Sequence, residues 1–434
     1  MSETLIGVIG IGALFFCLVA RLPVGMSLLV VGFGGIWWLD GSRAAIATMS
    51  SETYSSVTAY GLSIIPLFVL MGNVAGAAGY SQKLYEAAYA WIGRLRGGLG
   101  AATVMGCAAF AAVSGSSVAT AVTIGKVALP QMKRFGYADG LATGSVAAGG
   151  TLGILIPPST GFVLYAILTE ESIGKLFIAG ILPGLLLSLL FVVVIVIVTT
   201  LNPEQGPAGP TTTWGEKLWS TLMSMPLIGV ILVSIGGIYL GVFTPVEAAG
   251  VGAFLVTVLA LGTGAMKISK MPDILMETVV MTAMLYLIII GAHVFGPFLA
   301  LTHIPATLAE GLQSLGLGAY GTLLLILIGY IILGMFFDGL AMLVVTMPVV
   351  YPIITAFGFD PIWFGVVCVI VIEMGLITPP VGINVFVVKG VAQGVPMATI
   401  FRGVLPFWFA MAVCLLLLVL FPQIATFLPT QMKG

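Results

Sequence analysis

The sequence predicts an all-α polytopic membrane protein made of two inverted repeats, with about ten full spans and two re-entrant hairpins. Three observations carry this prediction. The 434 residues are 60% hydrophobic and 7% charged, and apolar runs of membrane-spanning length recur along the chain. The pair Pro157-Pro158 recurs as Pro379-Pro380, 222 residues further on. Lys and Arg gather on one side of the predicted spans.

The repeat extends well beyond the proline pairs. The same ungapped offset carries Pro130 onto Pro352 and Gly153 onto Gly375. A polar, Pro- and Gly-rich stretch from about residue 202 to 214 lies near the middle of the chain and suits a linker. We therefore predict a first repeat at 1–210 and a second at 211–434.

The elements of each repeat follow from apolar runs and from the residues that interrupt them. The first repeat is expected to hold scaffold helices at 1–78 (spans 4–20, 23–39 and 61–78), an arm helix at 81–95, a hairpin at 97–133, a broken helix at 139–168 and a helix at 173–200. The second is expected to hold scaffold helices at 218–300 (spans 218–241, 246–265 and 278–300), an arm helix at 302–313, a hairpin at 318–354, a broken helix at 361–395 and a helix at 398–427.

Charge distinguishes a hairpin from a single crossing. Arg94 and Arg96 precede the first apolar stretch, and Lys133 and Arg134 follow it. Positive charges collect on the cytoplasmic side, so a hairpin that enters and leaves on that side keeps both pairs inside. Each repeat then crosses the membrane five times. Because five is an odd number, the second repeat has the opposite orientation in the membrane to the first. This orientation puts eleven basic residues inside and three outside, with the N- and C-termini periplasmic. The first span lacks the basic flank of a secretory signal and is expected to be retained.

The tip of the first hairpin is polar. It reads Ser114-Gly115-Ser116-Ser117, and Thr120 follows one turn later. Hydroxyl oxygens and freed backbone carbonyls suit Na⁺, and helix N-termini offer N–H groups to a carboxylate. The alternative is close helix packing through small residues. The residues alone do not separate these two interpretations.

The second tip carries an acidic residue. The offset places Asp338 and Gly339 opposite Ser116 and Ser117, and Asp338 is the only acidic residue of its hairpin. A carboxylate at membrane depth indicates a functional site. We expect it to coordinate a cation or to order the tip; the alternative is an interfacial loop position.

The proline pairs predict breaks inside both broken helices. Two consecutive prolines remove two backbone donors and leave carbonyls unpaired. Those carbonyls, with Thr378 and Asn384, are candidate cation ligands; a structural kink is the alternative. Glu373, one turn before the second break, is expected to pair with a polar partner or to line the cavity.

Nothing in the sequence indicates an enzyme. The pair Gly125-Lys126 does not belong to a P-loop, so transport must use an ion gradient or a partner's ATPase. A serine protease would need a histidine beside the serine tip, and an aspartyl protease a second mid-membrane aspartate. The net charge of −1 gives no basic field for nucleic acid. We predict a secondary transporter without cofactors; a channel or an enzyme without ion coupling is the alternative.

Several motifs together resemble a known family. They are Ser114-Gly-Ser-Ser-Val-Ala-Thr-Ala, Gly149-Gly-Thr-Leu-Gly-Ile-Leu-Ile-Pro-Pro-Ser, Ile178-Ala-Gly-Ile-Leu-Pro-Gly, Phe337-Asp-Gly and Leu376-Ile-Thr-Pro-Pro-Val-Gly-Ile-Asn. The combination resembles the large membrane (M) subunit, DctM-like, of tripartite ATP-independent periplasmic (TRAP) transporters, over essentially the whole chain.

The resemblance implies an ion-transporter-superfamily fold that works as an elevator in the bacterial inner membrane. It implies Na⁺-driven symport of organic acids such as C4-dicarboxylates. It also implies a small four-helix membrane subunit (Q), expected as a separate polypeptide, and a periplasmic substrate-binding protein (P).

The tips and breaks together give the candidate site residues. The candidates for the first Na⁺ site are Ser114, Gly115, Ser116, Ser117, Gly153 and Pro157. Those for the second are Asp338, Gly339, Thr378, Pro379 and Gly382. The substrate candidates, placed between the two tips, are Ser116, Thr120, Pro158, Ser159, Pro380 and Asn384.

Overall fold

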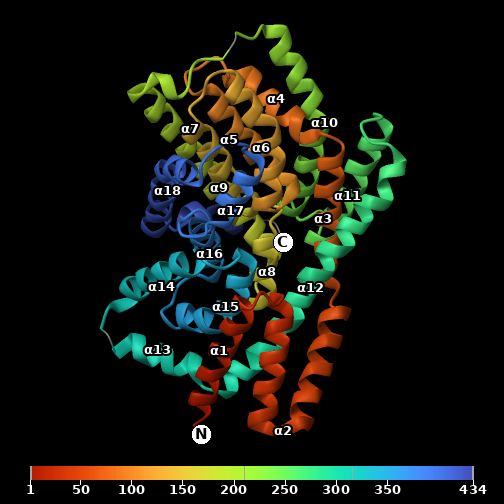
Figure 1. The fold of residues 1–434 in the computed structure, drawn as a ribbon. Helices are drawn as coiled ribbons and strands as arrows, with labels where there is room; N and C mark the ends of the chain where they lie inside the picture. Colours follow the sequence, from red (N-terminus) through yellow and green to blue (C-terminus); the bar gives the residue numbers. More distant parts are fainter. Residues whose placement is uncertain (1, 210, 315, 433–434) are drawn as a thin grey trace.

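The computed structural model describes residues 2–209, 211–314 and 316–432, and every regular element within them is a helix (Figure 1). The first half contains α1 Glu3–Val19, α2 Val24–Thr58, α3 Ile64–Ala77, α4 Tyr80–Ile92, α5 Gly98–Ser114, α6 Ser117–Arg134, α7 Asp139–Thr151, α8 Thr160–Thr169 and α9 Ile173–Leu201. The second half contains α10 Trp214–Tyr239, α11 Pro245–Gly262, α12 Met271–Leu301, α13 Ile304–Ser314, α14 Gly318–Gly334, α15 Gly339–Ala356, α16 Pro361–Leu376, α17 Ile383–Val391, α18 Met397–Leu420 and α19 Gln423–Thr430. The all-helical prediction is confirmed.

Local signals in the sequence explain where many of these helices begin. Thr213 and Thr244 each form a capping box with a glutamate three residues later, at the starts of α10 and α11. Asp360 caps α16 and is followed by proline at the first helical position. Side chains that accept a backbone N–H in this way satisfy donors that a helix start leaves free.

The helices of the second half recur at the separation seen in the sequence. Helices α6 and α15 both have 18 residues, and their bounds differ by 222 positions. Both proline pairs lie between short helices and contain a cis peptide bond. The segment before α8 and the segment before α17 therefore interrupt equivalent paths through the molecule.

The predicted span 23–39 was too short. Helix α2 bends at Gly41, where φ is 86°, and continues as helix to Thr58. Residues 42–58 contain many Ser and Thr, so their hydropathy gave no sign of a helix. Two smaller corrections concern the second half: α12 begins at Met271 rather than 278, and the predicted helix 398–427 divides into α18 and α19.

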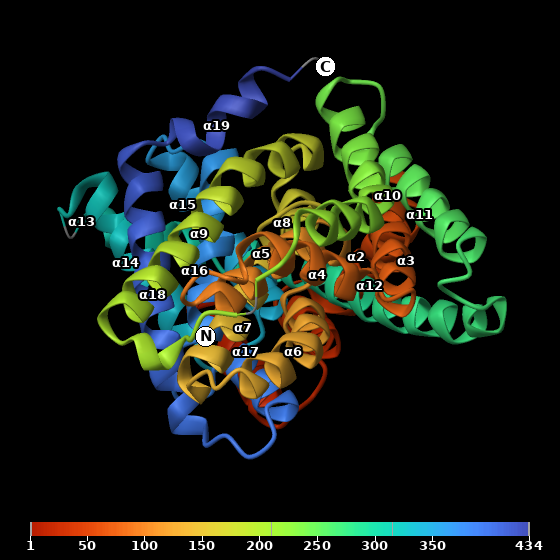
Figure 2. The same ribbon diagram turned by 90° about the horizontal axis from the view of Figure 1, so that it is seen from above.

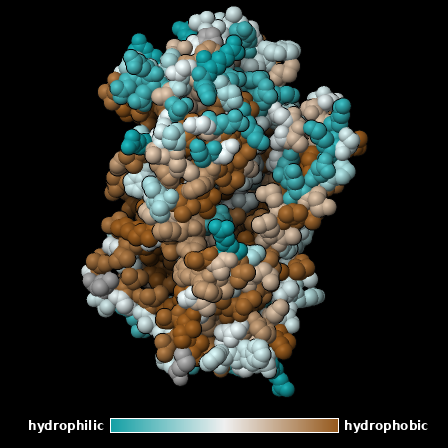
Figure 3. Space-filling view, in the orientation of Figure 1, coloured by the Kyte–Doolittle hydropathy of each residue, from teal (hydrophilic) through white to brown (hydrophobic). Residues whose placement is uncertain are grey.

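Among the described residues, eight stretches of helix are long and apolar enough to cross a membrane, and five shorter helices are also apolar. Hydrophobic side chains fill most of the middle of the molecule (Figure 3). Hydrophilic side chains gather at the upper end, where Figure 1 places the segment joining α9 to α10 and the turn between α11 and α12. This is the surface of a multi-pass membrane protein.

The helices form two neighbouring groups. Helices α2 and α12 pack along each other, as do α3 and α11, and α10 lies beside α11. On the other side, α18 packs against α7 and α9, and α16 lies beside α9 and α14 (Figure 2). The two tips and both breaks belong to this second group, so the first group forms a wall beside them.

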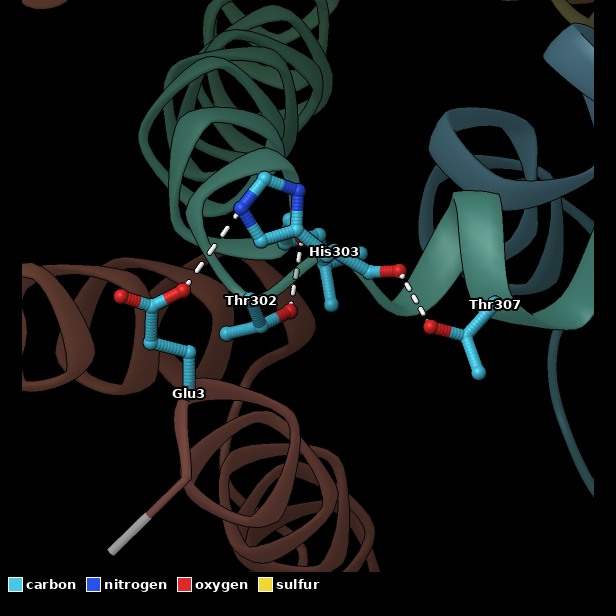
Figure 4. A network of polar contacts seen from close by, with 5 residues as sticks. Glu3, Thr302, His303 and Thr307 are labelled. Carbon is cyan, nitrogen blue, oxygen red and sulfur yellow. Dashed lines mark hydrogen bonds and ion pairs between the residues drawn. The ribbon is translucent and has the colours of Figure 1, made fainter.

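The turn between α12 and α13 touches the start of the chain. His303 adopts a left-handed φ of 54°, and its Nε2 lies 3.6 Å from Oε2 of Glu3 (Figure 4). Thr307 donates a hydrogen bond of 2.9 Å to the His303 carbonyl. Both charged side chains are exposed, so this ion pair contributes little to stability.

Candidate functional site

The first tip is a tight connection between α5 and α6. Gly115 ends α5 with a φ of 60°, which a residue with a side chain would adopt only with strain. Ser116 then caps α6 by accepting a hydrogen bond from the Ala119 N–H. The hydroxyls of Ser114 and Thr120 lie 2.7 Å apart. The glycine turn thus brings Ser114, at the end of α5, against Thr120, in the first turns of α6.

This tip lies directly against the first break. The Gly115 carbonyl accepts hydrogen bonds from the Thr160 N–H, at 3.2 Å, and from the Thr160 hydroxyl, at 2.8 Å. A Cβ on Gly153 would lie 2.4 Å from the Ser116 carbonyl oxygen, so these backbones are in contact. The structure thus brings together the tip and Gly153 from the first group of candidates; Pro157 is buried in the same break.

A small cavity separates this tip from the wall. Ser114, Gly115, Ser159 and Thr160 line one part of it, and the rest of the lining is apolar, from α3, α8, α12 and Pro158. Its volume of about 20 Å³ suits a single water molecule or an ion of similar size. Hydroxyl and carbonyl oxygens around such a space are the donor set that Na⁺ uses.

The second tip is built differently. Asp338 caps α15, and its Oδ2 accepts from the N–H groups of Leu340, at 3.1 Å, and Ala341. A Cβ on Gly334 would lie 2.8 Å from Cα of Gly375, so α14 and α16 touch just before this tip. The tip therefore packs against the second broken helix through glycine and carries its acidic group on an exposed loop.

Thr378, Pro379 and Gly382, the candidates of the second Na⁺ site from the broken helix, have no hydrogen bond to Asp338. The Thr378 hydroxyl donates to the Met374 carbonyl at 2.6 Å and accepts from Trp408 Nε1 at 3.0 Å. Gly382 begins α17 with a φ of 62°, beside the Thr378 carbonyl. Pro379 is exposed. In this conformation the candidate residues of the second Na⁺ site are spread around the second break and do not meet at one point.

The six substrate candidates divide by exposure. Thr120, Pro158, Ser159 and Asn384 are buried, whereas Ser116 is partly exposed and Pro380 is exposed. The Ser159 hydroxyl is committed within its own turn, where it donates to the Ile154 carbonyl and accepts from the Phe162 N–H. The first break is therefore covered and the second open in the same structure.

The sequence left Glu373 outside the candidate groups, and the structure places it at their centre. Its Oε1 accepts from the Ser117 hydroxyl at 2.6 Å, and its Oε2 accepts from Asn384 Nδ2 at 3.1 Å. The expectation of a polar partner is confirmed. The first tip is therefore in contact with the first break and is also linked, through Glu373, to the second break. The sequence did carry a signal for Glu373, because an ionisable residue inside a membrane segment indicates a functional site.

The histidine that an enzyme would need lies elsewhere. His293 Nδ1 is 2.9 Å from the Ser56 hydroxyl, between α12 and α2. This is a packing histidine whose Nδ1 is satisfied by that hydroxyl. In the described residues, no group of three or more His, Cys, Asp or Glu side chains could hold a metal ion.

Comparisons with known proteins agree on one family. A family model described as the tripartite ATP-independent periplasmic transporter, DctM component, matches residues 11–424. The C4-dicarboxylate TRAP transporter large permease protein DctM of Pseudomonas aeruginosa is 39% identical, over 89% of this chain and 90% of that protein. The isethionate TRAP transporter permease protein DctMQ of Oleidesulfovibrio alaskensis is 32% identical, over 96% of this chain and 65% of that protein.

A solved structure resembles the fold. The crystal structure of the Alcanivorax borkumensis YdaH transporter superposes with a TM-score of 0.57 over 90% of this chain and 88% of that chain. The two sequences are 16% identical, so the likeness concerns the fold alone.

Proposed function

Because the chain belongs to the DctM component family of TRAP transporters and is a transporter permease rather than an enzyme, we propose that it is a Na⁺-coupled symporter subunit that imports organic acids by an elevator movement. The observation that carries the proposal is the first tip. Its hydroxyls and its Gly115 carbonyl meet the first break beside a cavity of ion size. One ion would bind between each tip and its broken helix.

The division of the helices into two groups supports the elevator. Both tips and both breaks lie in one group, and α2, α3, α11 and α12 form the wall beside it. A bound ion and substrate would then cross the membrane with the second group, which holds the tips and breaks, while the first group, the wall, stays in place. The two halves, 1–210 and 211–434, would act as inverted repeats, with the hairpins entering from opposite sides.

The substrate class follows from the site and from relatives. Relatives are named for C4-dicarboxylate and for isethionate, so selectivity differs within the family. Helices α6 and α8 begin at the first tip and break, and helix N-termini favour negative charge. We therefore propose a small organic acid, with a dicarboxylate as the first candidate.

Two protein partners complete the proposal. A small four-helix membrane subunit (Q) would bind the wall, and a periplasmic substrate-binding protein (P) would deliver the substrate. The name of the permease DctMQ joins M and Q in one protein, which supports the first partner. The assembly would sit in the inner membrane among lipids, with both termini of this chain periplasmic.

The test is reconstitution. Purified chain, small subunit and candidate binding proteins in proteoliposomes should take up a dicarboxylate when Na⁺ is higher outside, and should not do so under an equal K⁺ gradient. Uptake that needs ATP, or flux that ignores the Na⁺ gradient, would contradict the proposal.

Removing hydroxyls from the first tip should weaken the response to Na⁺. Replacing Ser116 and Ser117 together with alanine is expected to raise the Na⁺ concentration for half-maximal uptake about tenfold or more, because two oxygen ligands are lost. The measurement is initial uptake at varied Na⁺. Ser145→Ala is the control, because this buried hydroxyl donates only to the Ala142 carbonyl and to a nearby sulfur. An unchanged Na⁺ response in the double variant would place the first site elsewhere.

A further inference from the structure

The surroundings of Glu373 are unusual for a carboxyl group. The side chain lies on α16 and is 1% exposed. One oxygen accepts from Ser117 at the first tip and the other from Asn384 on α17. Glu373 therefore joins the first tip, in one half of the chain, to the second break, in the other half.

Within the described part of the chain, no Lys, Arg or His nitrogen lies within 4.0 Å of the Glu373 carboxylate. Across the described ranges 2–209, 211–314 and 316–432, the one ion pair joins His303 to Glu3. A buried carboxyl group without a positive partner carries its charge only at a high cost, so its ionised form needs a cation from outside the chain.

The hydrogen bond also determines what Ser117 can do. A serine hydroxyl has one proton and two lone pairs. The proton is committed to Glu373 at 2.6 Å, so both lone pairs remain for a ligand. An ionised acceptor also polarises the hydroxyl and makes its oxygen a better cation ligand. The Ser117 hydroxyl is thereby fixed as an acceptor, two positions after Gly115 in the chain.

We propose that Glu373 is the positioning residue of the Na⁺ site at the first tip: it orients the Ser117 hydroxyl toward the ion and supplies the negative charge that balances it. This inference rests on the proposed function and deepens it. Na⁺ binding at the first tip would then depend on the second break, because Glu373 on α16 and Asn384 on α17 lie on either side of that break. Occupation of a site formed by one half would then stabilise the docking of the other half.

Thermal unfolding of the purified chain measures this without transport. Addition of NaCl should raise the melting temperature of the wild type relative to equal choline chloride, because the ion binds the folded state. In Glu373→Gln, which keeps the shape and an acceptor oxygen but removes the charge, the midpoint of this Na⁺ effect should rise about 10- to 100-fold. The control is Thr151→Val, at the equivalent position of the first half. Its buried hydroxyl donates only to the Ala148 carbonyl of its own helix, so the midpoint should not change.

A double-variant cycle tests the route through Ser117. If Glu373 acts through that hydroxyl, Glu373→Gln should shift the midpoint much less in a Ser117→Ala background than in the wild type. If Glu373→Gln does not fold, Ser117→Ala alone reports the same link, and an unchanged midpoint there overturns the inference.

The outcomes separate the two proposals. A wild type with a Na⁺-specific rise and a Glu373→Gln variant with the same midpoint overturn the role of Glu373 and leave the Na⁺ symporter standing. A wild type without any Na⁺-specific rise contradicts both.

Discussion

Gly403→Ala is expected to destabilise the protein by about 2 kcal/mol or more, since overpacking a close contact costs about 1–3 kcal/mol and occasionally more. Helices α7 and α18 cross with their backbones in contact. A Cβ on Gly403 would lie 1.9 Å from the Gly140 carbonyl oxygen, and one on Gly144 would lie 2.3 Å from the Gly403 carbonyl oxygen. Both obstacles are backbone, which cannot rotate away as a side chain can. The two helices would have to separate.

The same substitution at Gly329 is the matched control. Gly329 lies inside α14, and a Cβ there would meet nothing within 4 Å. Alanine is favoured over glycine in a helix interior by about 1 kcal/mol, so Gly329→Ala should raise the melting temperature slightly while Gly403→Ala lowers it. Equal melting temperatures for the two variants in detergent would show that α7 and α18 do not cross this closely.

Asp338→Ala is expected to abolish Na⁺-coupled uptake while the protein remains folded. The side chain caps α15 through the Leu340 and Ala341 N–H groups, and loss of a cap costs about 1 kcal/mol, which a domain of this size tolerates. The second tip would lose its only carboxylate and with it the charge that favours a cation. Initial uptake in proteoliposomes and the melting temperature are the two measurements.

Asp338→Asn separates the cap from the charge. Asparagine caps a helix about as well as aspartate, so α15 should begin at the same residue. If the charge serves the ion, the asparagine variant should be as inactive as the alanine variant. Uptake near the wild-type rate in Asp338→Asn would reduce Asp338 to a cap and remove it from the ion site.

Much of the helix pattern was predictable because the sequence marks helix ends with specific chemistry. Proline pairs, Ser116 and Asp360 break or cap helices through interactions a few residues away, and these can be read locally. The second part of α2 could not be found in this way. Its Ser and Thr residues give it low hydropathy, and it is held as helix beyond a bend at Gly41 by packing against α12.

The candidate site was predictable only in part, for a similar reason. The first tip and Gly153 are each recognisable from a polar or flexible residue inside an apolar run, and the structure brings them together. The link from Ser117 to Glu373 spans 256 positions, and no periodicity or spacing rule connects residues that far apart. Glu373 could be identified as an anomaly in the sequence, but its partners required the fold.

The covered first break and the open second break have a consequence for the energy of the molecule. Two halves with the same order of helices occupy unequal surroundings: Pro157 and Pro158 are buried, while Pro379 and Pro380 are exposed. If each half took up the surroundings of the other, the result would be a second conformation of comparable energy, related to the first by a two-fold exchange of the halves. Under the proposed elevator movement, a chain made of two such copies would encode both ends of that movement, and a small free-energy difference, supplied by an ion or a substrate, would choose between them.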